Sequence, residues 1–127
     1  MAPLLDTQAF LWWVTDDPRL SKRASRAIAG SACLLSVASC WEMAIKVSLG
    51  KLTLPGAVDR FVQEQLEVNG FRLLAVSLEH VGVVAALPFH HRDPFDRLLI
   101  AQALAEGFPI VTGDHRFAEY GVEVCWS

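Results

Sequence analysis

Two acidic residues each follow directly on an apolar run, at opposite ends of the chain. Asp6 comes straight after Leu4 and Leu5, and Asp114 closes the stretch "IVTGD" at 110–114. If both runs are parallel strands, their carboxyl ends lie at the same edge of a sheet, where ligands bind. A single acid at the end of a strand is also compatible with an exit to solvent. The interpretation therefore depends on whether further acids reach the same place.

Two more acids begin the apolar faces of expected helices. Asp96 is followed at i+3, i+4, i+7 and i+8 by apolar residues, the spacing of one helix face: Leu99, Ile100, Ala103 and Leu104. Glu42 stands one turn before Ile45 and two turns before Leu49. Each acid has a structural alternative. Asp96 could reach back to the backbone N–H of an N-cap residue, Asp93, and Glu42 could be a solvated acid near a helix start.

Four carboxylates in one cleft would repel one another strongly, because a low-dielectric site disfavours like charges. A hard divalent cation removes that repulsion. Mg²⁺ and Mn²⁺ prefer oxygen ligands and keep coordinated waters for a phosphate substrate. Together the acids predict a Mg²⁺ or Mn²⁺ site made from Asp6, Glu42, Asp96 and Asp114.

The elements that must position these acids alternate along the chain. Short apolar runs predict strands at 2–5, 33–37, 71–77, 109–114 and 122–126. Helical periodicity and capping residues predict helices at 7–14, 21–30, 38–52, 57–69, 78–86 and 93–107. Unalternated apolar strands separated by helices are typical of a parallel sheet that is covered on both faces. We therefore expect an α/β fold and one domain over residues 1–127.

Composition restricts the class of protein. With 127 residues, 53% of them hydrophobic and 20% charged, the chain is expected to be globular rather than disordered. A net charge of −3 argues against passive nucleic-acid binding, but not against a nuclease whose acids hold a cation. No apolar run is long enough to span a bilayer and no secretory signal is evident, so a cytoplasmic protein without a membrane partner is expected. The three cysteines form no C-x-x-C pair, and ordinary buried or half-buried thiols are expected.

Four stretches, in this order, resemble the PIN-domain family and, within it, the VapC-type ribonuclease toxins of toxin–antitoxin pairs. They are "LLDTQAFLWW" at 4–13, "SVASCWEMAIKVSLGKL" at 36–52, "LPFHHRDPFDRLLIAQAL" at 87–104 and "IVTGDHRFAEYGV" at 110–122. The resemblance covers nearly the whole chain. Two departures are Cys40, where a large aliphatic residue is more usual, and Gly113, where a side chain is common.

The resemblance implies a compact PIN-like α/β/α sandwich that cleaves RNA as a Mg²⁺- or Mn²⁺-dependent endoribonuclease, with products ending in 3′-hydroxyl and 5′-phosphate. The family's four acids fall on Asp6, Glu42, Asp96 and Asp114. Asp6 and Asp96 are then expected to hold the principal metal and Asp114 to complete its shell. Glu42 is expected to hold or polarise a coordinated water. A homodimer face and a groove for the C-terminal segment of a cognate antitoxin are also implied.

Thr7, Thr112 and Arg97 are possible supporting residues. The two hydroxyls flank the acids and are expected either to bind a metal water or to cap the following turn. Arg97 could touch a substrate phosphate, and a solvated or ion-paired side chain is the alternative. His90 and His91 are adjacent and lack a third ligand, so we expect a surface loop there rather than a metal pair.

The remaining cationic and aromatic residues leave alternatives open. Four basic residues lie in or next to one expected helix: Arg19, Lys22, Arg23 and Arg26. They form either an ordinary solvated face or a track for RNA that leads to the acids. Four tryptophans exceed the needs of one small core, so some are expected at a partner surface: Trp12, Trp13, Trp41 and Trp126.

Rival functions fit less well. A non-catalytic partner-binding module with the PIN fold would be favoured by a degraded set of acids, whereas all four acids are present. An aspartyl phosphotransferase of the haloacid dehalogenase type needs a second Asp two residues after the first, where this chain has Gln8. A receiver domain needs paired acids after its first strand, and these are absent too.

Overall fold

A five-stranded parallel sheet lies at the centre of the molecule. The computed structural model describes residues 2–126, and the strands occur in the order β3-β2-β1-β4-β5. The central strand pairs on both sides, since Leu4 lies opposite Leu34 and Ile110. The strands are short: β1 Leu4–Leu5, β2 Leu34–Ser36, β3 Arg72–Leu74, β4 Ile110–Val111 and β5 Val124–Cys125.

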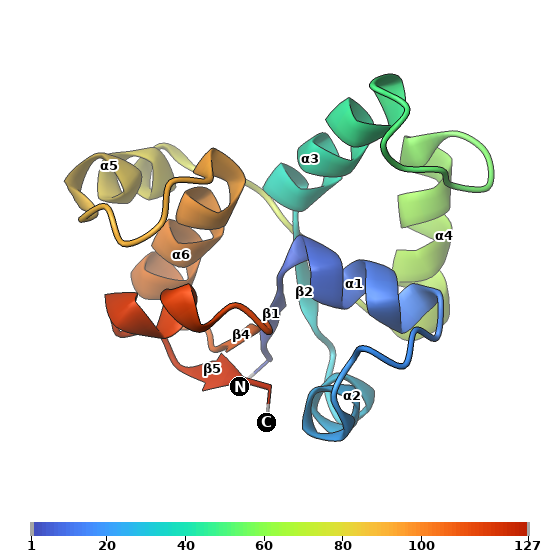
Figure 1. Ribbon diagram of the computed structural model, residues 1–127, viewed down its shortest axis with the longest axis horizontal. Coiled ribbons are helices and arrows are strands. Elements are labelled where there is room, and N and C mark those ends of the chain that lie inside the picture. The colour runs from blue at the N-terminus through green and yellow to red at the C-terminus, as the bar shows by residue number, and fades with distance from the viewer. Residues whose placement is uncertain (1, 127) are drawn as a thin grey trace.

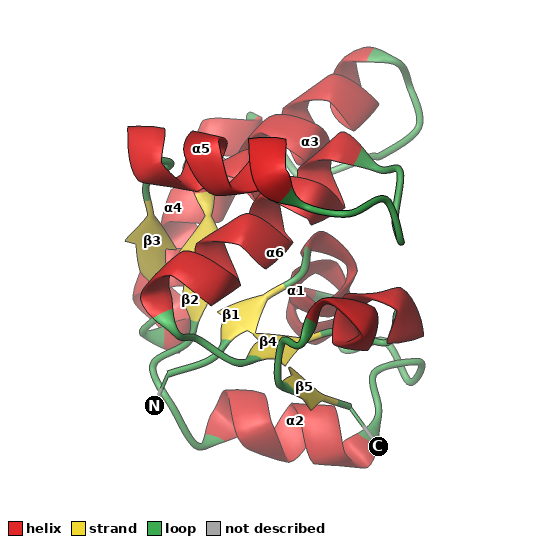
Figure 2. Ribbon diagram, turned by 90° about the vertical axis from the view of Figure 1, so that its left-hand side faces the viewer, coloured by secondary structure: helices red, strands yellow, loops and turns green. Residues whose placement is uncertain are grey.

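Helices cover both faces of this sheet (Figure 1). In the orientation of Figure 1, α1, α2 and α4 lie to the right of β1 and β2, and α5 and α6 lie to the left. Figure 2 shows α5 and α6 in front of the yellow strands. The helices are α1 Thr7–Val14, α2 Lys22–Ala29, α3 Val37–Ser48, α4 Val58–Asn69, α5 Leu78–Ala86 and α6 Pro94–Glu106, with a 3₁₀ helix, η1, at His115–Tyr120. The expected α/β fold with a covered parallel sheet is confirmed.

Each face of the sheet has its own apolar core, because neighbouring residues of a strand point to opposite sides. Leu5 and Val111 pack with Phe10 of α1 on one face. Leu4 and Ile110 pack with α6 and η1 on the other. Strands that are buried on both sides carry continuous apolar residues, which explains why no alternation appears in their sequence.

Capping residues fix where the helices begin and end. Ser21 accepts a hydrogen bond from the backbone N–H of Ala24 at the start of α2, and Asp93 accepts from two backbone N–H groups at the start of α6. Gly107 ends α6 in the left-handed conformation, with φ 79°. These three boundaries agree with the sequence prediction.

Helix α3 turns Glu42 inward, as its position one turn before Ile45 predicted, but other apolar residues of the helix are exposed. The exposed fractions of Trp41 and Leu49 are 60% and 62%. Ser39 and Met43 are buried together with Glu42. Trp41 packs edge-on against Phe95, with ring centroids 5.1 Å apart. Within residues 2–126, no helix is both long enough and apolar enough to cross a membrane.

Candidate active site

The four acids converge on one cleft at the carboxyl edge of the sheet. Asp6 and Asp114 follow the adjacent strands β1 and β4, and the backbone N–H of Asp6 donates to the carbonyl of Val111 at 3.1 Å. Glu42 comes from the second turn of α3 and Asp96 from the first turn of α6. The cleft has a volume of about 560 Å³, and all four acids line it. The convergence predicted from the ends of the strands is present.

Asp6 is both the N-cap of α1 and a buried acid of the cleft. Its Oδ1 accepts the backbone N–H of Ala9 at 2.6 Å. Burial raises its pKa to about 6, although the hydrogen bonds from Thr112 and Ala9 act in the opposite direction. Among the described residues, no Lys or Arg side chain forms an ion pair with Asp6.

Glu42 is held by two neighbours. The hydroxyl of Thr7 donates to its Oε1 at 2.7 Å, and Lys46 Nζ lies 2.9 Å from its Oε2, one helical turn away. The carboxylate is almost fully buried. Thr7 therefore orients an acid of the cleft. Thr112 acts on two acids, because its side chain hydrogen-bonds Asp6 and its hydroxyl accepts the backbone N–H of Asp114 at 3.0 Å.

Asp96 forms no ion pair with a Lys or Arg side chain of residues 2–126. Burial, followed by repulsion from Asp93, raises its pKa to about 8. The alternative of a capping box is wrong, because the backbone N–H of Asp93 donates to His91 Nδ1 at 3.1 Å and not to Asp96. The Asp96 carboxylate instead lies 2.9 Å from His91 Nε2. The acid faces the cleft rather than its own helix terminus.

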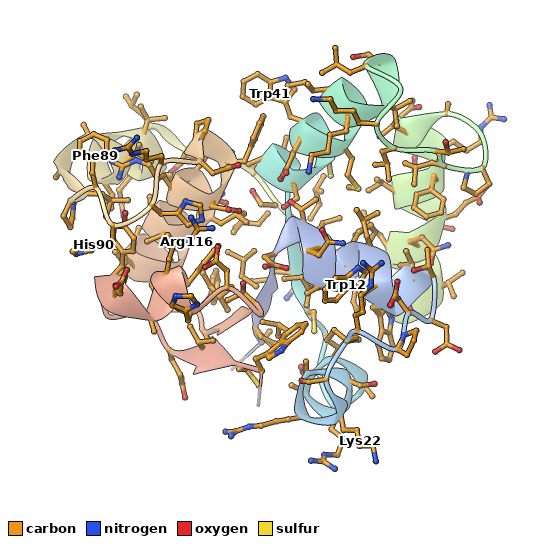
Figure 3. The ribbon with its side chains drawn as sticks, in the orientation of Figure 1. Trp12, Lys22, Trp41, Phe89, His90 and Arg116 are labelled. Carbon is orange, nitrogen blue, oxygen red and sulfur yellow. The ribbon has the colours of Figure 1, made fainter. Side chains whose placement is uncertain are left out.

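Asp114 is the acid most firmly held in its charged form. Arg116 donates to both of its oxygens, with Nη2–Oδ2 at 2.8 Å and Nε–Oδ1 at 3.0 Å. Burial opposes ionisation, but the hydrogen bonds from Arg116 outweigh it and lower the pKa of Asp114 to about 2. Figure 3 shows Arg116 beside α6 and Trp12 on α1, on opposite sides of β1.

His91 is a residue of this site that the sequence prediction missed. It was expected in a surface loop with His90, but only His90 is exposed, and His91 has an exposed fraction of 4%. Its Nε2 lies 2.9 Å from Asp96 Oδ2 and 3.0 Å from Asp114 Oδ2. Because Nδ1 accepts the Asp93 N–H, the ring proton stands on Nε2 and is donated to these two carboxylates. His91 thus joins two acids that belong to different elements.

Comparison with known proteins decides the family. A family model of the PIN domain matches residues 4–123. The chain belongs to the PIN domain family. It is 31% identical over 119 residues to Ribonuclease VapC22 of Mycobacterium tuberculosis, covering 92% of this chain and 90% of that protein.

Solved structures share the fold of this PIN domain. FitAcB from Neisseria gonorrhoeae superposes with a TM-score of 0.67 at 20% identity, over 95% of this chain and 94% of that chain. VapBC2 from Rickettsia felis, bound to a DNA fragment from its promoter, gives a TM-score of 0.69 at 16% identity, over 98% and 97% of the two chains. DNA-bound VapBC from Salmonella typhimurium gives 0.69 at 14% identity, over the same shares. The PIN-like α/β/α arrangement is thereby confirmed.

Arg97 has a structural role in this PIN domain, which corrects the expectation of a phosphate contact or a solvated side chain. Its guanidinium is 7% exposed and donates to backbone carbonyls, among them Pro88 at 2.8 Å and Val84 at 3.2 Å. It also lies 4.2 Å from the centre of the Phe89 ring. These bonds fix the loop that carries His91, so Arg97 acts on the site through the backbone. Figure 3 shows Phe89 and His90 at the outer edge of the molecule, away from Trp12.

Three of the basic residues around α2 line different hollows. Arg19 lines the acidic cleft, whereas Lys22 lines a second groove between α1, α2 and α4. Arg23 lines a third, smaller hollow beside Pro109. Of these three, Arg19 is the one that lines the cleft of the four acids.

The oxygen atoms of the cleft suit a hard divalent cation. Carboxylate oxygens of Asp96 and Asp114 lie within 4.8 Å of each other, and both accept from the Nε2 proton of His91. Lys46 and Arg116 neutralise Glu42 and Asp114, but Asp6 and Asp96 have no such partner among residues 2–126. Burial is the main reason why the pKa values of Asp6 and Asp96 are raised, and repulsion from neighbouring acids adds to it. Carboxylates without cationic partners are ligands that Mg²⁺ and Mn²⁺ prefer.

Proposed function

We propose that this PIN domain is a Mg²⁺-dependent endoribonuclease that hydrolyses RNA phosphodiester bonds, and that Mn²⁺ can replace Mg²⁺. The observation that carries the proposal is that one cleft holds Asp6, which is buried, and Asp96, which is half-buried, and that their pKa values are raised to about 6 and about 8. Such groups cost stability unless a cation binds them. A relative that is 31% identical and is named a ribonuclease supports RNA as the substrate.

Each acid has a part in this proposal. Asp6 and Asp96 hold the principal metal, Asp114 completes the shell, and Glu42 orients a water, with its own carboxylate held by Thr7 and Lys46. When bound, the divalent ion activates a water as nucleophile and offsets the charge that develops on the phosphoryl oxygens. His91 keeps Asp96 and Asp114 at a fixed separation by donating its Nε2 proton between them. These residues form a prearranged set, so little reorganisation is needed when substrate arrives.

We also propose that the chain is the toxin of a toxin–antitoxin pair and acts in the cytoplasm as a homodimer. The proteins of similar structure include VapBC and FitAB, and the similarity to Ribonuclease VapC22 points the same way. Trp41 and Leu49, exposed on α3 and at its end, offer apolar surface for an interface. If an antitoxin arginine enters the acidic cleft, it competes with the cation. The antitoxin must then bind the metal-free protein more tightly than the Mg²⁺-loaded one.

The decisive experiment is cleavage of RNA by the purified chain. Cleavage should stop in excess EDTA and return with Mg²⁺ or Mn²⁺, and Asp6→Asn should be inactive under all of these conditions. Undiminished cleavage in EDTA would refute metal dependence. If the folded wild type cleaves no RNA at all, the alternative of a non-catalytic PIN-fold partner-binding module is favoured.

A further inference from the structure

One wall of the acidic cleft is lined by three planar groups in a row. The guanidinium carbon of Arg19 lies 4.7 Å from the centre of the Trp12 ring. The rings of Trp12 and Trp126 follow, with centroids 5.9 Å apart and planes tilted by 50°. All three side chains line the cleft that contains Asp6 and Asp114. Arg19, Trp12 and Trp126 form what we call the planar column, which continues directly from the candidate metal site.

The outer end of the planar column is a guanidinium whose plane is fixed. Asp17 accepts from Arg19 Nε at 3.0 Å and from Nη2 at 2.7 Å, and also from the backbone N–H of Arg19 at 2.9 Å. The Arg19 side chain is nevertheless 68% exposed. One face covers Trp12, so the opposite face is open to solvent.

This arrangement suits a nucleobase better than a phosphate. A phosphate is bound best by the charged fork of an arginine, but Nε and Nη2 of Arg19 are already committed to the carboxylate of Asp17. What remains available is a flat, charge-compensated surface. Unpaired bases stack on aromatic rings and on guanidinium planes, with little dependence on which base it is.

The inner end of the column is fitted to the strand that carries Asp114. A Cβ atom at Gly113 would lie 3.0 Å from Cε2 and Cζ2 of Trp126, so the missing side chain makes room for the indole. The carbonyl of Trp126 accepts a hydrogen bond from the hydroxyl of Ser21. The departure from the family pattern at Gly113 is thereby explained, since it places an aromatic ring beside an acid of the cleft.

We propose that the planar column is a nucleobase-binding subsite, in which an unpaired base of the RNA stacks on the open face of Arg19 while the neighbouring phosphodiester lies at the acids. The inference rests on the proposed function and specifies its substrate as single-stranded RNA. Stacking is tolerant of base identity, so the column fixes the position of the strand rather than reading its sequence.

The test compares Arg19→Lys, Arg19→Ala and wild type, with Lys22→Ala as a control that removes the same charge outside the cleft. The substrate is a single-stranded oligoribonucleotide that wild type cleaves with Mg²⁺. A matched series carries one abasic ribose at each position around the cleaved bond. We expect both Arg19 variants to raise KM for the intact strand by about tenfold, with kcat nearly unchanged. One abasic position should raise the wild-type KM equally and have no further effect in the Arg19 variants.

Several outcomes would overturn the inference. A wild-type KM in Arg19→Lys would show that charge alone matters, because lysine keeps the charge and loses the plane. Additive effects of Arg19→Ala and every abasic position would mean that no base contacts Arg19. Unchanged RNA kinetics together with weaker binding of a partner protein would assign the column to protein docking instead. A wild type that cleaves no RNA would refute the proposed function itself, which is a distinct result.

Discussion

Replacing Asp96 and Asp114 by asparagine in the metal-free protein should shift its stability in opposite directions. The two carboxylates share His91 as a hydrogen-bond donor, yet their surroundings differ. Burial and Asp93 raise the pKa of Asp96 to about 8, whereas Arg116 holds the pKa of Asp114 at about 2 against the effect of burial. Asp96→Asn removes a group that the folded state disfavours in its charged form. Asp114→Asn removes a charge that the folded state stabilises.

The magnitudes follow from linkage. An aspartic acid whose pKa rises from its ordinary 3.8 to about 8 on folding opposes folding at pH 7.5 by at most about 5 kcal/mol. Asparagine recovers roughly half of this, since its amide is also desolvated and accepts less strongly from His91. We expect a gain of about 2 kcal/mol, or a rise in Tm of roughly 6 to 8 °C. For Asp114 the shift from 3.8 to about 2 corresponds to at most about 2.4 kcal/mol, and we expect a loss of about 1 kcal/mol.

The direction of the Asp96 pKa shift also determines how the stability of wild type changes with pH. The raised pKa of Asp96 means that wild type loses stability relative to Asp96→Asn as the pH rises from about 4 towards 8. The difference should therefore change sign, from about 2 kcal/mol in favour of wild type at pH 4 to about 2 kcal/mol in favour of Asp96→Asn near pH 8. Denaturant unfolding in EDTA at several pH values measures this, with Glu64→Gln on the exposed face of α4 as the control. If Asp96→Asn is less stable than wild type at pH 8, the carboxylate has a structural role and the reasoning is refuted.

Three further predictions concern the same cleft. Binding of Mg²⁺ at pH 7 should release close to one proton, because Asp96, with a pKa of about 8, must ionise. Calorimetry in buffers of different ionisation enthalpy measures the number of protons released. If no proton is released, the raised pKa of Asp96 is contradicted. His91→Gln should weaken Mn²⁺ binding by about tenfold with little change in the ratio of Mn²⁺ to Mg²⁺ affinity, since His91 positions carboxylates rather than binding metal. A large change in that ratio would make His91 a ligand. Arg97→Lys should lower the free energy of unfolding by about 2 kcal/mol, because an ammonium cannot reach the carbonyls of Pro88 and Val84 together. If the midpoint of denaturant unfolding is unchanged, those hydrogen bonds are dispensable.

Much of the fold follows from local sequence signals. The start of α2 and both ends of α6 were predictable from their capping residues. Ser21 and Asp93 have short oxygen-bearing side chains that accept backbone N–H groups, and Gly107 adopts the left-handed conformation that ends a helix. Asp6 and Asp114 were predictable for a different reason. A parallel sheet gathers the ends of its strands at one edge whatever the details of packing.

Packing between elements was not predictable in the same way. The apolar spacing of α3 placed Glu42 at the head of an inward face with Ile45 and Leu49. Glu42 is buried beside Met43, yet Leu49 and the neighbouring Trp41 are exposed. Periodicity identifies a helix but cannot choose between two faces of similar hydrophobicity. Glu42 points into the cleft because Thr7 and Lys46 satisfy its carboxylate there, and these contacts depend on how α1 and α3 pack.

His91 depends on still longer-range structure, and this explains why two adjacent histidines gave no usable signal. Its ring reaches Asp96 and Asp114 only because Arg97 ties the preceding loop to the molecule through the carbonyl of Pro88, and because Tyr120 accepts the His91 N–H at 2.8 Å. Each of these partners lies on a different element. A pattern search along the chain therefore sees the histidine and its acids as unrelated residues.

Ion pairs with basic side chains reduce the repulsion among the four acids of the cleft in the metal-free protein. Lys46 and Arg116 compensate two of the four carboxylates, and His91 donates to Asp96 without adding a charge of its own. What remains uncompensated is Asp6 with Asp96, the pair whose pKa values are raised. Side-chain cations of the protein thus compensate two of the four acids of the cleft, and the proposed cation would compensate the other two. In the proposed function, a divalent ion at Asp6 and Asp96 would bind without first displacing Lys46 or Arg116.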